Sequence, residues 1–373
     1  MNITIATGPL LPVPAVKGGA VQKLWHTLAV EFARAGHAAV IVARAFPGQP
    51  AAECREGVRY LRWGGFDQSL SVRRDLLKDF FYAARTTFQL PAADILVTND
   101  FWLPCMAAWL RPAAGKVVVN ANRFPKGQFR LYRRVARIAA ASSAVRNAVV
   151  AQCPALADRT FVFPNPVDTS LLKPVRRETG AEKVLLFVGR LHPEKGCHLL
   201  VPAFARFLRT CPGWRLRLVG PVDTGHGGGG DEYRRRLEGL AAGLPVEFVG
   251  PVFDPVKLAA CYQQADLFCY PSLAEMGEAF GVAPLEAMAC GVPAVVSSLD
   301  CFRDFITDGI NGVFFDHRAA DPETQLATAL QIAVASDSAL LAMGQAAASS
   351  SQRFSVPAVA RQYLEDFAAL IAA

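Results

Sequence analysis

Short apolar runs alternate with amphipathic stretches along most of the chain. Residues 2–7 have the pattern of a strand, and a loop rich in proline and glycine follows to Gly19. Apolar residues then recur at helical spacing from Val21 to Ala35, and Gly36 is placed to end that helix. Further strands are predicted at "AAVIVA", "DILVT" and "KVVVN". Because strands that alternate with helices pair in parallel, this half predicts a doubly wound α/β domain.

The alternation breaks at "FPNPVDTSLLKPVRRETGAEK" and then starts again with "VLLFVG", "LRLVG", "VEFVG", "DLFCYPS" and "PAVVS". A second doubly wound parallel sheet is the economical interpretation. We predict Rossmann-like domains over residues 1–164 and 165–355, and a last helix, 356–373, that packs back onto the first domain. Ligands of such folds bind at the carboxyl ends of the strands, so we expect a central cleft that both domains face.

The composition is that of a globular chain. With 373 residues, 52% hydrophobic and 19% charged, two domains of ordinary size are expected. No run approaches the roughly 18–20 apolar residues of a membrane span, and "MNITIATGP" lacks the features of a signal peptide. Nine cysteines without a C-x-x-C pair argue against a disulfide framework or a zinc site. These features predict a cytoplasmic protein.

Positive charge is concentrated in the first half. Residues 1–170 hold 21 lysines and arginines against 10 aspartates and glutamates, whereas residues 171–373 hold 18 against 22. Much of the excess lies in "SVRRDLLKDFFYAARTTF" and "QFRLYRRVARIAAAS". Both predict amphipathic surface helices, and the alternative is docking on an anionic membrane face as a peripheral protein. No nucleic-acid-binding motif is present, so a nucleic-acid partner is not expected.

The segment "GEAFGVAPLEAMACGVPAVVS" keeps two glutamates, Glu278 and Glu286, in an apolar run. Gly281 and Pro284 disfavour one helix across both. We predict a helix from Pro284 to Cys290, with Gly291 just past its end and a buried strand after it. Glu286 on the first turn can simply complement the helix dipole. Glu278, in the preceding loop, has a weaker structural explanation.

Two cations follow the strand "VLLFVG", which Gly189 ends. Arg190 and Lys195 in "GRLHPEKG" are placed at the carboxyl edge of the second sheet. Either alone can be an ordinary surface charge. Together with the free N–H groups of a helix that starts near Val282, they predict a site for a diphosphate.

At this point the sequence resembles a known family. "FPNPVDTSLLKP", "FVGRLHPEKG", "PSLAEMGEAFGVAPLEAMACGVPAVVS" and "DGINGVFFD", in this order, resemble the retaining, GT-B-fold, nucleotide-sugar glycosyltransferases of family four. The resemblance covers the second half and extends more loosely to "VKGGAVQ" and "NDFWLP". It implies a nucleotide-sugar-binding second domain and an acceptor-side first domain.

The resemblance also implies roles for individual residues. Arg190 and Lys195 would hold the donor diphosphate and stabilise the charge that grows as the sugar leaves. Glu278 would hold the sugar hydroxyls, and Glu286 the ribose hydroxyls. The remaining donor contacts would come from backbone: Gly189, Gly281, Val282 and Ala283 near the phosphates or sugar, Val249 and Gly250 near the base, and Gly18 and Gly19 from the first domain.

The implied chemistry is hexose transfer from a nucleotide diphosphate sugar, UDP- or GDP-type, to a hydroxyl of a glycan, glycolipid or small molecule. The anomeric configuration would be retained and the leaving phosphate would take the acceptor's proton. No Asp-x-Asp motif is present, so metal independence is expected, with no cofactor beyond the donor itself. Synthesis of a cell-envelope or exported glycan is the expected setting.

The first half departs from the family. Many relatives carry a histidine after the strand that here continues as "NANRFPKGQ", where Asn120 and Asn122 stand instead. Asp100 is the nearest candidate for a catalytic acceptor-side carboxylate, although it can equally cap a helix beginning at Phe101. Asn120, Asn122, Lys126 and Gln128 are candidate contacts to the acceptor or the donor sugar.

Other functions remain open at this level. The same fold serves nucleotide-sugar epimerases and hydrolases, which need no acceptor. A non-catalytic nucleotide-sugar-binding module is a third candidate, because the histidine is missing. A nicotinamide dehydrogenase is disfavoured, since "ITIATGPLLPVPAVKGG" lacks a G-x-G-x-x-G turn.

Overall fold

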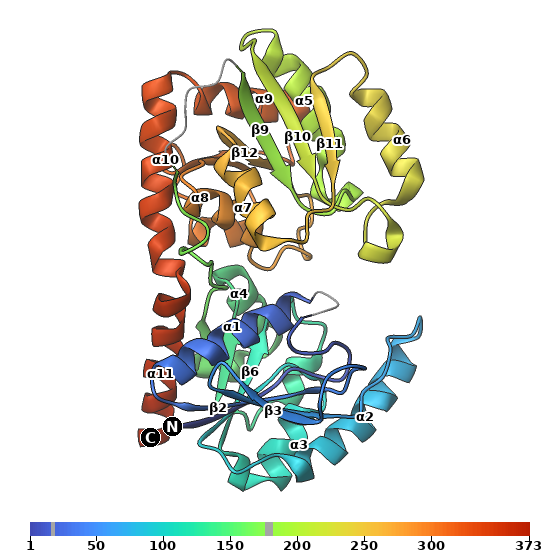
Figure 1. Ribbon diagram of the computed structural model, residues 1–373, viewed down its shortest axis with the longest axis vertical. Helices are drawn as coiled ribbons and strands as arrows, with labels where there is room; N and C mark the ends of the chain where they lie inside the picture. The colour runs from blue at the N-terminus through green and yellow to red at the C-terminus, as the bar shows by residue number, and fades with distance from the viewer. Residues whose placement is uncertain (16–18, 176–181) are drawn as a thin grey trace. The chain divides into compact units, whose positions relative to one another are not determined.

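The computed structural model describes residues 1–15, 19–175 and 182–373, and these form two compact units (Figure 1). The first unit contains Met1–Pro166 and Val356–Ala373, and the second contains Val167–Ser355. Each unit is a largely parallel sheet covered by helices. The predicted fold class, two doubly wound Rossmann-like domains, is therefore confirmed.

The first unit is built on an eight-stranded sheet of order β3-β4-β2-β1-β5-β6-β7-β8, parallel except for β3 against β4. Its strands are β1 (Asn2–Ala6), β2 (Ala38–Arg44), β3 (Ala52–Arg55), β4 (Val58–Trp63), β5 (Ile95–Thr98), β6 (Lys116–Ala121), β7 (Arg137–Ala140) and β8 (Thr160–Val162). Its helices are α1 (Ala20–Arg34), α2 (Val72–Gln89), α3 (Leu103–Leu110), α4 (Ser143–Gln152) and α11 (Val356–Ala372), with 3-10 turns η1 (Pro112–Ala114), η2 (Gln128–Leu131) and η3 (Pro154–Arg159).

The order of the strands places a topological switch point beside β1. This strand pairs with β2 on one side, Ile3 opposite Ala39, and with β5 on the other, Ile3 opposite Ile95. Chain connections leave the sheet in opposite directions from such a point, which opens a crevice outside the carboxyl ends of the two strands. The residues that follow β1 and β5 therefore occupy the usual ligand position of this fold.

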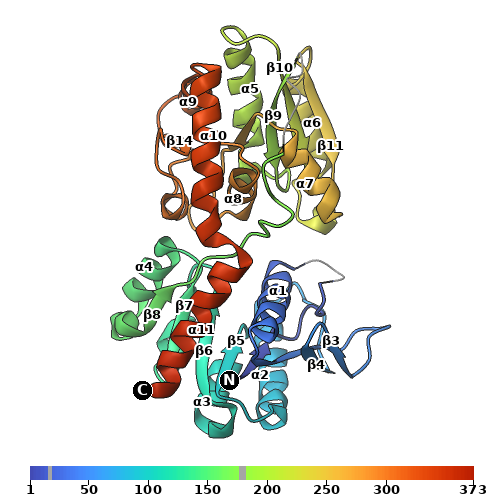
Figure 2. The same cartoon turned by 60° about the vertical axis from the view of Figure 1, so that its left-hand side comes forward.

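Helix α11 belongs to the first unit although it is the last element of the chain (Figure 2). Its apolar face, with Val359, Tyr363 and Phe367, is part of the buried cluster that includes α1 and the central strands. The Tyr363 ring stacks on Phe163 at 4.4 Å and meets Trp25 edge-on at 5.3 Å. Aromatic burial of this kind, on the order of 2–3 kcal/mol for each ring, holds the C-terminal helix against the first sheet.

The second unit is built on a six-stranded parallel sheet of order β11-β10-β9-β12-β13-β14, with its switch point between β9 and β12. Its strands are β9 (Lys183–Val188), β10 (Trp214–Val219), β11 (Val246–Gly250), β12 (Leu267–Tyr270), β13 (Ala294–Ser297) and β14 (Gly312–Phe315). Its helices are α5 (Cys197–Leu208), α6 (Gly230–Leu240), α7 (Pro255–Gln263), α8 (Val282–Ala289), α9 (Pro322–Ala333) and α10 (Asp337–Ser351), with 3-10 turns η4 (Pro193–Lys195), η5 (Thr224–His226), η6 (Asp300–Asp304) and η7 (Gln352–Phe354).

One predicted surface helix is wrong. The segment "QFRLYRRVARIAAAS" forms the short turn η2 and then strand β7, which pairs with β6 and β8. Phe129, Tyr132 and Val135 recur every third residue and imitate a helical face, but they are buried by a loop that leads into the sheet. The other predicted surface helix, in "SVRRDLLKDFFYAARTTF", is confirmed as α2.

In the described parts of the chain, no single helix combines the length and apolar character needed to cross a bilayer. By length and composition alone, the bent pair Pro322–Ala333 and Asp337–Phe354 passes the same test.

Candidate active site

The predicted donor residues come from two loops at the switch point of the second unit. One loop follows β9 and carries Arg190 and Lys195, and the other follows β12 and carries Glu278. Gly196 brings these loops together. It adopts φ +72°, and a Cβ there would collide with the Pro271 carbonyl oxygen. The Leu273 N–H donates to the Glu194 carbonyl at 2.7 Å, which fixes the β12 loop against the β9 loop.

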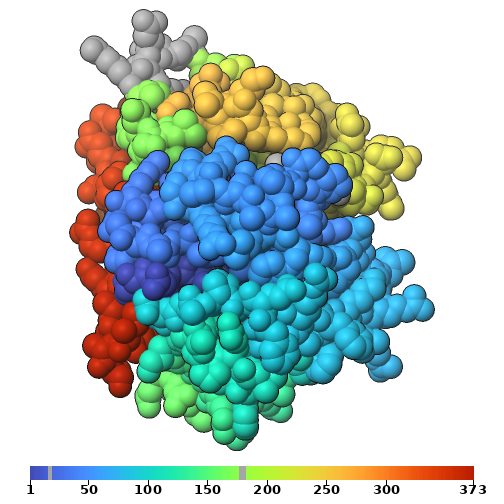
Figure 3. Space-filling view, turned by 60° about the horizontal axis from the view of Figure 1, so that its bottom comes forward, coloured from blue at the N-terminus to red at the C-terminus, as the bar shows by residue number. Residues whose placement is uncertain are grey.

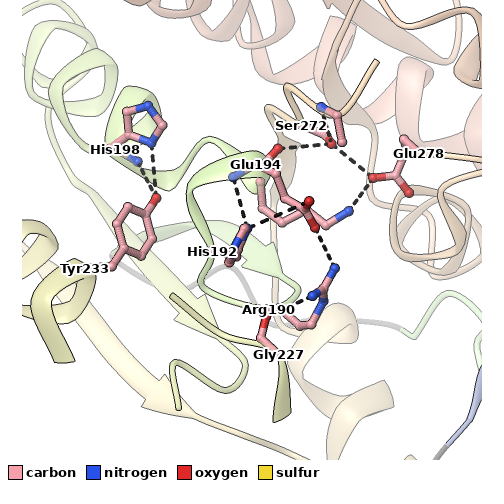
Figure 4. A network of polar contacts seen from close by, with 10 residues as sticks. Arg190, His192, Glu194, His198, Gly227, Tyr233, Ser272 and Glu278 are labelled. Atoms are coloured by element: carbon pink, nitrogen blue, oxygen red, sulfur yellow. Dashed lines mark hydrogen bonds and ion pairs between the residues drawn. The ribbon is translucent and has the colours of Figure 1, made fainter. Parts of the chain in front are cut away.

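Lys195 and Glu278 form a buried ion pair. The Lys195 ammonium lies 2.6 Å from Glu278 Oε2, and each side chain is about 90% buried. The Ser272 hydroxyl donates to the same oxygen at 3.0 Å (Figure 4). Burial, and then the negative charge of Glu278, raises the pKa of Tyr270 well above its usual value. A charge so buried is retained only where its partners are well placed.

Arg190 lies on the same loop as Lys195 but pairs with Glu194, not with Glu278. Its guanidinium donates to Glu194 Oε1 at 2.6 Å and to the Gly227 carbonyl at 2.8 Å, on the glycine run 227–230 (Figure 4). The Arg190 and Glu194 side chains are both about 40% exposed. An exposed ion pair of this type contributes roughly 0–1 kcal/mol, so another anion can replace Glu194 as the partner of Arg190 at little cost.

The neighbouring strands β9, β10 and β11 each have a glycine at the carboxyl end: Gly189, Gly220 and Gly250. Gly189 N–H donates to Val219 O at 2.9 Å, and Gly220 N–H donates to Gly250 O at the same distance. Gly220 has φ +145°, and a Cβ there would collide with the Gly189 carbonyl oxygen. The half-buried Val249 and Gly250, predicted near the base, end β11 at the edge of this row of strands.

Helix α8 begins at Val282, two residues before the expected start. Gly281 is the N-cap with φ +81°, and a Cβ there would collide with the Phe302 ring. Pro284 is the third residue of the helix, a position where the missing N–H removes no intrahelical bond. The N–H groups of the first residues, Val282 and Ala283, remain a suitable end for an anion. Gly291 lies past the helix at φ +77°, as predicted.

Because the helix starts early, Glu286 is its fifth residue and does not sit on the first turn. Its Oε2 accepts a hydrogen bond from the Tyr262 hydroxyl at 2.8 Å. Tyr262 is fully buried, and burial followed by the charge of Glu286 raises its pKa well above the usual value. The side chain is half-buried and therefore held in one place while part of it faces solvent.

In the first unit, Asn120 and Asn122 lie together at the end of β6. Asn122 Nδ2 donates to Asn120 Oδ1 at 2.7 Å, and the Trp25 indole donates to the same oxygen at 3.3 Å. The Trp25 indole also donates to Asn99 Oδ1 at 3.1 Å, after β5. The buried Asn122 Oδ1 has no hydrogen-bond partner in the described structure. These amides are thus at the carboxyl edge of the first sheet.

Asp100 is buried beside Asp79 of α2 and does not cap a helix. Helix α3 begins at Leu103, and Asp79 Oδ2, not Asp100, accepts the Trp102 N–H at 3.2 Å. Both carboxyl oxygens of Asp100 are without a hydrogen-bond partner in the described residues. Burial, then Asp79, raises the pKa of Asp100 well above its usual range, and burial raises the pKa of Asp79 to about 6.

The other first-domain candidates are more peripheral. Lys126 N–H donates to Gln128 Oε1 at 2.7 Å in an exposed loop. Gly19, at φ +111°, is the N-cap residue of α1, where a side chain would collide with Gln22. Gly18 lies outside the described residues. Within the described ranges, no three His, Cys, Asp or Glu side chains converge as metal ligands do, and metal independence stays a prediction.

Sequence reasoning missed four contributors to the site: Glu194, Tyr262, Tyr270 and Ser272. Tyr270 and Ser272 lie in the quoted motif, two residues apart at the end of a buried strand, which is where such a fold places ligand contacts. That spacing was a usable signal. Glu194 and Tyr262 gave none, because their roles depend on which side chain the fold brings opposite them.

The comparisons with known families agree with this geometry. Residues 169–349 match the family model described as Glycosyl transferases group 1. This matched part of the second unit, residues 169–349, is called the group 1 domain below. Residues 18–171 match the model described as Glycosyltransferase Family 4. The two matches together support the predicted resemblance to a GT-B glycosyltransferase of group 1 with a family-four-like N-terminal domain, while retention of configuration stays a prediction.

Individual relatives match over part of the chain. A D-inositol 3-phosphate glycosyltransferase of Geodermatophilus obscurus is 39% identical over 171 residues, 43% of this chain and 37% of the relative. A phosphatidyl-myo-inositol mannosyltransferase of Mycobacterium tuberculosis is 35% identical over 162 residues, 42% of this chain and 40% of the relative. The chain thus spans about two fifths of the length of these curated relatives.

Solved structures share the whole fold. The sucrose-phosphate synthase of Thermosynechococcus elongatus has a TM-score of 0.78 at 22% identity, covering 100% of this chain and 99% of that one. HepE of Anabaena, solved in complex with UDP and glucose, has a TM-score of 0.72 at 21% identity, covering 99% of each chain. At these identities the likeness shows the GT-B fold.

Proposed function

We propose that the protein is a retaining glycosyltransferase that moves a hexose-type sugar from a nucleotide diphosphate donor to a hydroxyl acceptor. One observation carries the proposal. The group 1 domain holds a buried Lys195–Glu278 pair between the β9 and β12 loops, at the position where doubly wound sheets bind ligands. Arg190 stands on the same loop as Lys195, within reach of the same ligand.

The cations provide the driving chemistry. Lys195 is desolvated, so its charge acts on a neighbouring phosphate with little screening from water. Arg190 exchanges Glu194 for a phosphate oxygen, which it can bind in a bidentate way. As the sugar leaves, both cations stabilise the charge that accumulates on the diphosphate. The N-terminus of α8 adds backbone N–H groups to the same anion.

The transfer balances without a further reactant. The bond between the anomeric carbon and the donor phosphate oxygen breaks, and a bond from that carbon to the acceptor oxygen forms on the same face. The proton of the acceptor hydroxyl passes to the leaving phosphate oxygen. No protein base is needed in this scheme. Because Arg190 and Lys195 supply the leaving-group role of a metal, we expect turnover to persist in the presence of a chelator.

The two glutamates recognise the alcohols of the donor. A carboxylate offers about four acceptor positions, so Glu278 can keep Lys195 and Ser272 and still accept a sugar hydroxyl. Glu286, held by Tyr262, accepts the ribose hydroxyls. The base, from a UDP- or GDP-type donor, lies near Val249 and Gly250.

The first unit supplies the acceptor side. Asp100, Asn120 and Asn122 lie at the carboxyl edge of its sheet, with buried polar atoms that have no partner in the described structure. Such atoms cost about 1–3 kcal/mol each when unsatisfied, which favours a ligand that donates or accepts hydrogen bonds there. The names of two relatives specify inositol-containing acceptors, so inositol phosphate and phosphatidylinositol belong in an acceptor panel.

The decisive experiment measures nucleotide release from a panel of UDP- and GDP-sugars, with and without acceptors. Acceptor-dependent release supports transfer. Donor consumption without an acceptor would identify an epimerase or hydrolase, and donor binding without any turnover a binding module. The panel is repeated in EDTA, where unchanged turnover is expected.

Two variants assign the site within the same assay. Lys195→Ala should lower kcat/KM by about 100-fold or more, the usual loss when a charge-stabilising group is removed. Glu286→Ala should lower it by a similar factor, because hydrogen bonds from the two ribose hydroxyls to a charged group, roughly 1.5–3 kcal/mol each, are lost. Lys183→Ala is the matched control. Lys183 starts the same strand β9 at its opposite end and pairs with Asp337, so its loss should leave turnover unchanged. Normal turnover in both site variants would reject the site.

A further inference from the structure

Helix α2 exposes large apolar side chains and buries polar ones, the reverse of an ordinary surface helix. Its buried face includes Asp79, Tyr82, Thr86 and Thr87. Leu77, Phe81 and Phe88 are instead 60–67% exposed. Leaving these three large side chains exposed costs roughly 1–2 kcal/mol each relative to burial. A partner that buries the row would therefore bind favourably.

A row of cations runs parallel to the apolar row. Arg74, Lys78 and Arg85 each lie three positions before Leu77, Phe81 and Phe88, so the two rows are neighbours along the whole helix. All three cations are exposed. Among the described residues, neither Arg74 nor Arg85 pairs with a carboxylate. The acid of the first turn, Asp75, is occupied by the Ser69 N–H at 3.1 Å.

The same character continues onto the neighbouring elements. On α3, which packs against α2, Trp109 and Leu110 are more than half exposed, and Leu131 of η2 is nearly half exposed. The Arg134 guanidinium lies over the Trp109 ring at 3.2 Å from its centroid. Figure 3 views the molecule from the side on which α2 and α3 lie. The α2–α3 face is defined here as the exposed Leu77, Phe81, Phe88, Trp109, Leu110 and Leu131 with Arg74, Lys78, Arg85 and Arg134.

Charge complementarity indicates which kind of partner binds the α2–α3 face. A second copy of the chain docked through this face would oppose cations to cations, which is destabilising. A bilayer with anionic headgroups accepts both rows at once: phosphates bind the guanidinium and ammonium groups, and the aromatic and leucine side chains enter the boundary with the acyl chains. We infer that the α2–α3 face docks the first unit onto an anionic lipid surface. This inference uses none of the residues assigned to sugar transfer and stands or falls independently of it.

Vesicle flotation with the full chain tests the inference. Vesicles of phosphatidylglycerol with phosphatidylcholine should carry the protein at low salt and release most of it as salt rises, because exposed charges are screened. Vesicles of phosphatidylcholine alone should carry much less. No flotation with anionic vesicles at low salt would overturn the inference.

Two variants separate the rows. Arg74→Gln/Lys78→Gln/Arg85→Gln should reduce partitioning about 100-fold, from roughly five-fold for each cation. Phe81→Ser/Phe88→Ser should reduce it at low and high salt alike. The control is Ile332→Ser/Leu341→Ser, which removes two exposed apolar side chains of α9 and α10 and should float normally. Circular dichroism checks that each variant is folded.

Other outcomes count against the inference. If the control variant lost flotation to the same extent, or if both row variants floated like the unchanged protein, the lipid contact would lie on another surface. Sedimentation that shows a dimer, abolished by Phe81→Ser/Phe88→Ser in a protein that does not float, would assign the face to a second copy instead.

Discussion

Ser272 is a residue whose importance appears only in the folded structure. Its hydroxyl donates to the same Glu278 oxygen that Lys195 binds, and its carbonyl accepts the Ser297 hydroxyl at 2.6 Å. It therefore orients the carboxylate without being placed to touch the reacting atoms, which makes it a positioning residue. The backbone around it is held by an independent bond, so its side chain can be changed without releasing the loop.

Ser272→Ala should lower kcat about ten-fold, the value of one hydrogen bond to a charged group, while changing the donor KM less. Ser272→Thr, which keeps the hydroxyl, should restore most of the rate. Steady-state kinetics with the preferred donor measures both. A merely structural role would lower the unfolding midpoint of Ser272→Ala without this split, and a rate equal to that of the unchanged protein would contradict the positioning role.

Asp79 and Asp100 make stability depend on pH. Their pKa values are raised in the folded state by burial, that of Asp79 to about 6. The folded chain therefore binds more protons than the unfolded chain above about pH 4. The contribution of these acids to stability is fully present below about pH 4 and falls above it; that of Asp79 is lost as the pH rises through about 6.

Asp100→Asn removes one of the two buried acids. We expect the thermal midpoint of this variant to fall less between pH 5 and pH 8 than that of the unchanged protein, and to be higher at pH 8. Asp158→Asn, at an exposed position, is the control and should leave the pH dependence as it is. If the thermal midpoint of Asp100→Asn depended on pH as that of the unchanged protein does, the assignment of this dependence to the buried acids would be contradicted.

At the scale of elements, the loop between β9 and α5 positions the site because Gly196 lets it approach Pro271. Two glycines of the second unit allow the effect of this close approach to be distinguished from the effect of backbone strain alone. Gly196 and Gly213 have similar φ values, +72° and +82°, but a Cβ at Gly213 meets nothing within 4 Å. Any residue other than glycine is strained at both positions, by roughly 1–2 kcal/mol.

Gly213→Ala should therefore cost about that strain energy and leave turnover intact. Gly196→Ala should cost more and should also lower turnover, since the loop must shift and take Lys195 with it. Chemical denaturation and the nucleotide-release assay measure the two effects. Similar losses of stability and no loss of turnover in Gly196→Ala would show that the close approach does not position the site.

Apolar periodicity in the sequence identifies some of these elements and misses others. The alternation of strands and helices identified β9 to β13 and α1 well, because their apolar patterns are long and bounded by glycine or proline. The hairpin β3–β4 escaped, since its turn uses Glu56 at φ +53° before Gly57 instead of a usual turn pair. The start of α8 was misplaced, because proline is tolerated at the third helical position as well as the first.

At the scale of the whole molecule, the sequence predicts the fold class and which side chains reach the site, but not their pairing. Arg190, Lys195 and Glu278 were expected as separate contacts to a ligand. In the structure Lys195 pairs with Glu278 in the interior, where a buried ammonium needs a partner, and Arg190 pairs with Glu194 nearer the surface. The Lys195–Glu278 pairing depends on contact between the β9 and β12 loops, 83 residues apart, which no local pattern encodes.

The exposure of the apolar face of α2 also could not be predicted from a local pattern. Its sequence mixes arginines and phenylalanines at helical spacing, which is compatible with either face turning inward. In the structure Asp79 lies on the buried face, where its carboxylate accepts the Trp102 N–H ahead of α3. The charge asymmetry between the halves of the chain was visible beforehand, whereas the exposure of the apolar row was not.

The most direct test of the central claim is titration calorimetry of UDP and GDP on the unchanged protein, on Lys195→Ala and on Lys183→Ala. The unchanged protein and Lys183→Ala should bind one of the two nucleotides with the same affinity, and Lys195→Ala should bind it at least ten times more weakly, a change of about 1.4 kcal/mol. Failure of both nucleotides to bind the unchanged protein, or equal affinity in Lys195→Ala, would contradict the assignment of this site to a nucleoside diphosphate.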